Sequence, residues 1–189
     1  SNIGKNLITA SYLTPEIKKL NAEFLRKNAF LLMEMGLDPG IDHMSAMKII
    51  DKLESNYDIK SFESYTGGLL TPNSKSYNPW NYKFTWNSKN VVLAGSQGAT
   101  YLENNKEVKL SYDEIFNKIN LIEIPELGFF EGYANRDSIK YIDIYNLKKI
   151  KTIFRGTLRN RGFCSAWDLF IKLGLTDDKI FVQKPYNMT

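Results

Sequence analysis

The sequence predicts an α/β protein with a mixed sheet, and three observations support this fold class. A strand, helix and strand pattern at residues 6–36 indicates a parallel βαβ unit. Several short strand patterns, one of them a hairpin, follow between residues 59 and 160. The chain has 189 residues, of which 43% are apolar, so it is long enough and apolar enough to bury a core.

The N-terminal elements make up the βαβ unit. Residues 6–10 are mostly apolar and predict a short buried strand, and Pro15 opens a helix expected over 15–28. A second apolar run at 29–36 predicts the parallel partner strand. Because functional loops of such units lie at the carboxyl ends of the strands, we expect one at residues 36–42.

The next segments combine one long helix with a polar and aromatic loop. Residues 41–53 place apolar side chains at helical spacing, which predicts an amphipathic helix. Residues 59–70 begin with the alternation of a strand and end in a double glycine. Residues 71–90 predict an ordered loop with a hydrophobic anchor, because a flexible linker would be poor in aromatics. The aromatic residues of this loop are Tyr77, Trp80, Tyr82, Phe84 and Trp86.

The second half of the chain predicts further strands and short helices. A hairpin is expected over 99–111 around Asn104 and Asn105, because asparagine tolerates the left-handed backbone of tight turns. The other expected elements are a helix over 111–119, a strand over 121–125, a helix beginning near Asp137, a strand over 148–160 and a helix over 163–175. The glycine-containing segment 126–136 is assigned no element, and the tail over 177–189 is expected to fray.

Composition and charge argue against several classes of function. The net charge is +4 with both signs interspersed, so we expect no nucleic-acid partner. No apolar window of about 18 residues and no signal-like start are present, which predicts no membrane partner and a cytoplasmic location. A single cysteine, Cys164, and a single histidine, His43, exclude a disulfide framework and a two-histidine zinc motif, so no metal is expected. Cys164 is expected to be an inert core residue.

The loop after the second strand holds the first candidate site. Asp38, Gly40, Asp42 and His43 surround a turn at a helix start, where backbone N–H groups hold anions and side chains bind polar substrates. The alternative is structural, with the aspartates capping the turn and the helix and the histidine lying in the core. Tyr12 directly follows the first strand and either faces the same cleft or only packs.

Arginine is unevenly distributed, which indicates a second candidate site. The chain has 20 Lys but only five Arg, and four of these fall in one stretch: Arg136, Arg155, Arg159 and Arg161. Because a planar guanidinium grips a carboxylate with two hydrogen bonds, the cluster predicts a ligand with several carboxylates. Surface ion pairs are the alternative for each, and a solvated strand-to-helix junction is favoured for Arg159 and Arg161.

Familiar nucleotide and hydrolase motifs are absent from the sequence. No GxGxxG follows a strand, and Gly95 and Gly98 have the wrong spacing for one. There is no P-loop and no GxSxG elbow. We therefore expect no cofactor-binding site within this chain and no complete catalyst.

Six segments are long or unusual enough to carry a family resemblance. From about Lys5 to Leu175 they are TASYLTPE, MEMGLDPGIDHMSAMKIID, SYTGGL, NPWNYKFTW, EGYANRDSI and RGTLRNRGFC. Together they resemble the saccharopine reductases, also called glutamate-forming saccharopine dehydrogenases. The resemblance implies a C-terminal βαβ remnant of a dinucleotide-binding Rossmann domain at 1–36, a saccharopine-binding-like α/β domain at 37–160, and the truncated start of a helical domain at 161–189.

The resemblance also implies a reaction. Enzymes of this family are NADP-dependent oxidoreductases that reduce the imine of 2-aminoadipate semialdehyde and glutamate to saccharopine, and the reverse direction serves lysine degradation. The chain would be the substrate-binding portion, inactive alone, with NADP(H) bound by the full-length protein and a homodimer possible.

Matching the motifs residue by residue places Tyr12, Asp38, Gly40 and Arg136 in the substrate cleft, with Arg155 as a further candidate. Tyr12 and Asp38 would hydrogen-bond the amine, and the arginines would clamp carboxylates. Asp42 and His43, in the same loop as Asp38, complete the expected substrate-binding set.

One departure and two alternatives accompany this resemblance. Thr66 in SYTGG stands where many relatives have cysteine, which bears on substrate preference. The first alternative is a carboxynorspermidine or homospermidine synthase, whose polyamine-like substrates carry fewer carboxylates. The second is a non-catalytic module for amino-acid binding or dimerisation.

Overall fold

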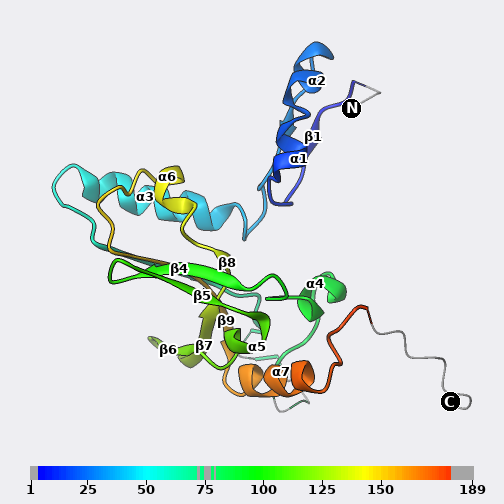
Figure 1. Ribbon diagram of the computed structural model, residues 1–189, viewed down its shortest axis with the longest axis vertical. Helices are drawn as coiled ribbons and strands as arrows, with labels where there is room; N and C mark the ends of the chain where they lie inside the picture. Colours follow the sequence, from blue (N-terminus) through cyan, green and yellow to red (C-terminus); the bar gives the residue numbers. More distant parts are fainter. Residues whose placement is uncertain (1–3, 72, 75–77, 79, 180–189) are drawn as a thin grey trace, which may run out of the picture. The chain divides into compact units, whose positions relative to one another are not determined.

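The computed structural model describes residues 4–71, 73–74, 78 and 80–179. The chain divides into two compact units, Ser1–Ile59 and Lys60–Thr189 (Figure 1). Tyr77 of the predicted aromatic loop, and the part of the predicted tail from 180 to 189, lie outside the described residues.

The first unit contains the predicted parallel βαβ arrangement. Its elements are β1 (Leu7–Ile8), α1 (Pro15–Lys18), α2 (Asn21–Arg26), β2 (Leu31–Leu32) and α3 (Ile41–Glu54). Strands β1 and β2 are parallel, with Leu7 opposite Leu31. The helix expected over 15–28 is divided in two, because the Leu20 N–H bonds the carbonyl of Ile17, three residues back, at 2.9 Å and tightens the turn.

The second unit is built on a mixed sheet, as the sequence predicts, and this sheet has seven strands within the described residues. Its strands are β3 (Ser61–Thr66), β4 (Ala99–Glu103), β5 (Lys106–Leu110), β6 (Ile119–Ile124), β7 (Gly128–Ala134), β8 (Arg136–Asp137) and β9 (Thr152–Asn160). Its helices are α4 (Ser88–Val92), α5 (Tyr112–Ile115), α6 (Tyr141–Ile144) and α7 (Phe163–Lys172). The main strand order is β5-β4-β9-β7-β6, with β3 parallel to β9 and β8 parallel to β4.

The expected hairpin is confirmed. Strands β4 and β5 pair antiparallel, with Glu103 opposite Lys106. Asn104 and Asn105 form the turn with φ angles of 50° and 63°. This is the left-handed backbone region that asparagine adopts at low cost, so the two residues fix the register of the hairpin.

The core of the second unit lies between its sheet and α7. Helix α7 packs against β7 and β9 (Figure 1). Its buried side chains are Phe163, Cys164 and Trp167, and the ring of Phe163 stacks on that of Trp167 with centroids 4.7 Å apart. Tyr82 of the aromatic loop joins this cluster, whereas Phe84 and Trp86 are half-exposed. The loop is therefore anchored to the core of the second unit by some of its aromatic side chains but not by all of them.

Two segments differ from the sequence-based expectation. Residues 126–136, assigned no element, include the buried strand β7. The helix expected near Asp137 begins only at Tyr141, because the Asp137 carboxylate accepts the Ile139 N–H at 2.8 Å and holds a turn there. Arg136 and Asp137 instead form the short strand β8.

Truncating the buried Ile153 near the start of β9 should destabilise the second unit strongly. Ile153 is 0% exposed, so Ile153→Ala removes buried methyl groups and leaves a cavity, which costs about 2–5 kcal/mol in free energy of unfolding. Urea unfolding measures this. Ile144→Ala, at a side chain 61% exposed, is the matched control and should change stability by less than about 0.5 kcal/mol. Equal losses in both variants would contradict the burial of Ile153.

Candidate functional site

A tight turn over residues 36–40 follows β2 in the first unit. The Gly36 N–H donates to the Pro39 carbonyl at 2.9 Å, and the Ile41 N–H donates to the Gly36 carbonyl at 2.9 Å. Gly40 has a φ of 148°, and a Cβ there would lie 2.1 Å from the Gly36 oxygen. The turn therefore requires glycine at position 40, so the backbone geometry accounts for the glycine at this predicted site position.

The turn brings together the two residues expected to hydrogen-bond a substrate amine. The Tyr12 hydroxyl donates to Asp38 Oδ1 at 2.6 Å. Asp42 is buried, and its Oδ1 accepts the Gly40 N–H at 2.7 Å. Tyr12 and Asp38 thus form a hydrogen-bonded pair at the turn, and Asp42 holds the backbone of the same turn.

His43 lies between two carboxylates of the same unit. Its Nδ1 is 3.6 Å from Asp42 Oδ2, and its Nε2 is 3.4 Å from Glu34 Oε2. Glu34 is absent from the sequence-based candidates. Its backbone φ of 60° is unusual for a residue with a side chain, and no feature of the sequence indicates that conformation.

A cationic pocket in the second unit contains Arg136. The cavity measures about 280 Å³ and is lined by Gln97, Gly98, Ala99, Thr100, Arg136, Asp137 and Lys140. Arg136 Nη1 lies 3.5 Å from Gln97 Oε1, and its backbone φ of 54° is left-handed. Arg136 and Lys140 together give this pocket, the Arg136 pocket, two cationic side chains and the neighbouring Asp137 carboxylate.

The remaining clustered arginines divide into buried and exposed side chains. Arg155 is 3% exposed, and its guanidinium carbon lies 4.3 Å from the centre of the Tyr141 ring. Its backbone N–H donates to Ser138 Oγ at 2.9 Å. Arg155 does not line the Arg136 pocket.

The solvated position expected for Arg159 is wrong. Arg159 is 4% exposed and its guanidinium carbon lies 5.0 Å from the centre of the Tyr82 ring and 5.1 Å from that of Phe163. The aromatic loop and α7 cover the end of β9, and the sequence of that strand alone does not show this. Arg161 is exposed, as expected.

Cys164 is buried at the start of α7. Burial is the main cause that raises the pKa of its thiol, and the nearby Glu131 carboxylate raises it further. A thiol with a raised pKa is a poor nucleophile at neutral pH, so the structure agrees with an inert role.

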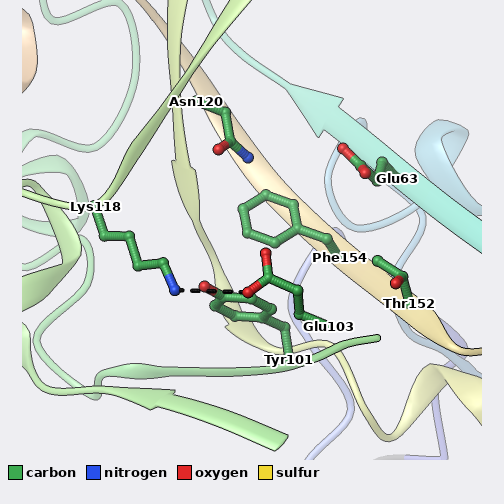
Figure 2. A pocket seen from close by; sticks show the side chains of 7 residues that line it. All are labelled: Glu63, Tyr101, Glu103, Lys118, Asn120, Thr152 and Phe154. Atoms are coloured by element: carbon green, nitrogen blue, oxygen red, sulfur yellow. Dashed lines mark ion pairs between the residues drawn. The ribbon is translucent and has the colours of Figure 1, made fainter. Parts of the chain in front are cut away.

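A second, smaller cavity in the same unit is lined largely by acidic and aromatic side chains. It measures about 40 Å³. Figure 2 shows the Lys118 ammonium pointing into this cavity. The ammonium lies 3.9 Å from Glu103 Oε2 and 5.4 Å from the centre of the Tyr101 ring. Because a cavity of about 40 Å³ has room for little more than water, the Arg136 pocket, at about 280 Å³, is the better candidate for a ligand.

Tyr65 lies beside this small cavity, on β3. Its hydroxyl donates to Glu63 Oε2 at 3.2 Å and accepts from Asn120 Nδ2 at 2.8 Å. Burial is the main cause that raises the pKa of Tyr65 to about 12, and the Glu63 carboxylate adds to it.

The structure also bears on metals and membranes. Over the described ranges, no three His, Cys, Asp or Glu side chains gather in a group that could hold a metal ion. In the same ranges, no helix is both long and apolar enough to span a membrane.

The fold and its polar groups define a mixed α/β protein with a glycine-dependent polar turn in one unit and a cationic pocket in the other. The family model described as Saccharopine dehydrogenase C-terminal domain matches residues 36–186. The chain therefore belongs to the saccharopine dehydrogenase C-terminal domain family.

Named relatives agree with this membership. The chain is 42% identical over 182 residues to the mitochondrial alpha-aminoadipic semialdehyde synthase of Bos taurus, covering 93% of this chain and 19% of that one. It is 36% identical over 174 residues to the saccharopine dehydrogenase [NADP(+), L-glutamate-forming] of Saccharomyces cerevisiae, covering 92% and 39%. The chain thus spans about a fifth to two fifths of the length of these relatives.

A solved structure supports the fold. The apo histidine-tagged saccharopine dehydrogenase (L-Glu forming) from Saccharomyces cerevisiae superposes with a TM-score of 0.79 at 36% identity. The match covers 92% of this chain and 39% of that one. The resemblance and the α/β fold class predicted from the sequence are both confirmed.

Replacing Gly40 should disrupt the turn that holds Asp38. Gly40→Ala forces a Cβ against the Gly36 carbonyl, so the first unit should lose at least about 2 kcal/mol of stability. Limited proteolysis, followed by mass spectrometry of fragments from residues 1–59, measures the loss. Gly68→Ala is the control, because a Cβ there meets nothing within 4 Å. Similar cleavage rates in the two variants would contradict the close approach.

The raised pKa of Tyr65 predicts a pH-dependent stability. A pKa raised by folding means that the folded state favours the protonated hydroxyl. The contribution of Tyr65 to stability is therefore complete below its ordinary pKa of about 10 and is lost as the pH rises towards about 12. The free energy of unfolding measured in urea should therefore fall more between pH 9.5 and 11.5 for the wild type than for Tyr65→Phe. Parallel pH profiles for the two proteins would disprove the shift.

Proposed function

We propose that this chain is the substrate-binding portion of an NADP-dependent, glutamate-forming saccharopine dehydrogenase. The observation that carries the proposal is the family match over residues 36–186, together with relatives named for this activity. The reaction in question reduces the imine between 2-aminoadipate semialdehyde and glutamate, or runs in reverse. We propose residues 1–36, 37–160 and 161–189 as its Rossmann-domain remnant, saccharopine-binding-like domain and start of a helical domain.

The charge of the Arg136 pocket supports this substrate class. Saccharopine carries three carboxylates, and a guanidinium with an adjacent ammonium attracts such groups by charge-assisted hydrogen bonds. Arg136 and Lys140 line one cavity, which is large enough for part of an amino-acid ligand. We assign carboxylate binding to Arg136, and Arg155 remains a further prediction for the same role.

The polar turn of the first unit supports recognition of the amine. The Tyr12 hydroxyl is already held at Asp38 by a 2.6 Å hydrogen bond, so both groups are fixed before a ligand arrives. A carboxylate and a hydroxyl at this distance hold a protonated amine and move a proton to or from it. Gly40, Asp42 and His43 complete this group in the proposal.

The cofactor is assigned to parts of the protein other than the described residues. Dinucleotide pyrophosphates bind at a glycine-rich turn between a strand and a helix. In this chain β1 ends at Ile8 and is followed by residues 9–14, which contain no glycine, before α1 begins at Pro15. The turn between β1 and α1 therefore offers no glycine-rich cradle for a pyrophosphate, and no step of the reaction is assigned to the described residues through the cofactor.

NADP⁺ reduction by the complete gene product tests the proposed function. Saccharopine and carboxynorspermidine are offered in parallel, with the 189-residue chain as the control. Turnover of saccharopine by the complete product supports the proposal. Turnover of the polyamine analogue alone would favour a carboxynorspermidine or homospermidine synthase, and inactivity on both would favour a non-catalytic module.

A cytoplasmic location and a homodimer remain predictions. The Bos taurus relative is named as mitochondrial, so the two locations are to be compared directly. Fractionation of the source cells and the mass of the complete gene product in solution test the two predictions.

Replacing Arg136 should weaken saccharopine binding in the complete gene product. Arg136 is exposed, so solvent screens its charge, and we expect Arg136→Ala to raise KM about 10- to 100-fold, or roughly 1.5–3 kcal/mol. The value of kcat should change little. Arg161→Ala removes another exposed arginine of the same unit and should leave KM unchanged. An equal KM in both variants would contradict the assignment of Arg136.

A further inference from the structure

Glu34 holds the chain on both sides of Tyr12. Its backbone N–H donates to the Ser11 carbonyl at 3.0 Å, and its side-chain Oε1 accepts the Leu13 N–H at 3.0 Å. Ser11 and Leu13 are the two neighbours of Tyr12 in the sequence, so one residue fixes the backbone before and after the tyrosine. The hydroxyl of Tyr12 is thereby aimed from a restrained segment at Asp38, 26 positions later.

The second carboxylate oxygen of Glu34 continues towards the loop that carries Asp38. Glu34 Oε2 lies 3.4 Å from His43 Nε2, and His43 Nδ1 lies 3.6 Å from Asp42 Oδ2. Asp42 in turn accepts the N–H of Gly40, two residues after Asp38. These contacts lead from the backbone beside Tyr12, through Glu34, His43 and Asp42, to the backbone beside Asp38. The hydrogen bond between Tyr12 and Asp38 closes the ring.

The positions of these residues argue against an incidental surface contact. The Asp42 side chain is 3% exposed, that of His43 18% and that of Glu34 27%. Glu34 also adopts its φ of 60°, a left-handed backbone conformation that is strained for a residue with a side chain. The surrounding contacts hold it in that conformation.

We propose that Glu34 and His43 are positioning residues that hold Tyr12 and Asp38 in register for the substrate amine. This inference rests on the proposed function, because it gives the two residues a role only through the Tyr12–Asp38 pair. Glu34 secures the tyrosine side, and His43 connects Glu34 to the aspartate side through Asp42. In this role both residues act through Tyr12 and Asp38.

Variants of Glu34 in the complete gene product test this role. Glu34→Ala removes both side-chain contacts, and we expect kcat for saccharopine to fall about 10- to 100-fold, while KM changes less than about threefold. Glu34→Gln keeps a carbonyl oxygen for the Leu13 N–H and should recover kcat to within about fivefold of wild type. The matched control is Glu54→Ala, at an exposed glutamate ending α3, which should leave both constants unchanged.

Hydrogen exchange gives a readout that does not depend on turnover. In the same proteins, peptides covering residues 9–15 should exchange faster in Glu34→Ala than in wild type, Glu34→Gln or Glu54→Ala, because the Leu13 N–H loses its acceptor. His43→Ala should lower kcat by about 3- to 10-fold without this exchange, since it breaks only the link towards Asp42.

The outcomes separate this inference from the proposed function. An active wild type whose kcat is unchanged by Glu34→Ala would overturn the positioning role. A loss of kcat that Glu34→Gln does not recover, together with faster exchange throughout the first unit, would show that Glu34 only stabilises the fold. That result would also overturn the positioning role. If the wild type does not turn over saccharopine, the proposed function fails. Exchange at residues 9–15 then decides whether Glu34 holds the Tyr12 segment, and unchanged exchange would overturn the inference.

Discussion

The pairing of β9 with three other strands is the constraint on which the second unit depends. It pairs in parallel with β3 from Thr152 to Thr157 and antiparallel with β7 from Gly156 to Asn160. Where these strands meet, a Cβ on Gly132 or Gly156 would come within 2.6–2.7 Å of the Tyr65 ring, so the packing of that ring requires both glycines. The position of Arg136 also depends on β9. The preceding residue, Asn135, donates its N–H to the Arg155 carbonyl on β9 at 2.8 Å, and β8, which contains Arg136, then pairs with β4.

The clustered arginines of the second unit differ in burial. Arg155 and Arg159 are buried, and burying a charge costs several kcal/mol unless other groups compensate. Their guanidinium groups face aromatic rings, which attract cations through their negative faces. Arg136 is exposed in a cavity, so it can exchange water for a ligand carboxylate at lower cost. Of these three arginines, Arg136 is therefore the one whose guanidinium is open to a ligand from solvent.

The first unit is held around its turn mainly by polar contacts. Leu7, Ile8 and Leu32 of its two strands are all more than 40% exposed, so these strands contribute little buried apolar surface. The turn and the Tyr12 segment are instead restrained by backbone hydrogen bonds, the Glu34 carboxylate and the buried Asp42. Such restraints fix direction better than apolar contacts do, because hydrogen bonds depend on angle as well as distance. A polar group arranged in this way is held rigid before any ligand binds.

The sequence alone determined what depends on local chemistry. Hydrophobic periodicity predicted the βαβ unit, α3, β9 and α7, and the two asparagines predicted the hairpin, because these signals act between near neighbours in the chain. Its motifs were specific enough to identify the family. Tertiary structure decided which charges are buried and which residues meet across the chain: Arg159 is covered by rings from two other segments, and Glu34 reaches both Leu13 and His43. No local pattern encodes such contacts, because they depend on where distant segments come together and on a left-handed backbone at Glu34 that only those contacts maintain.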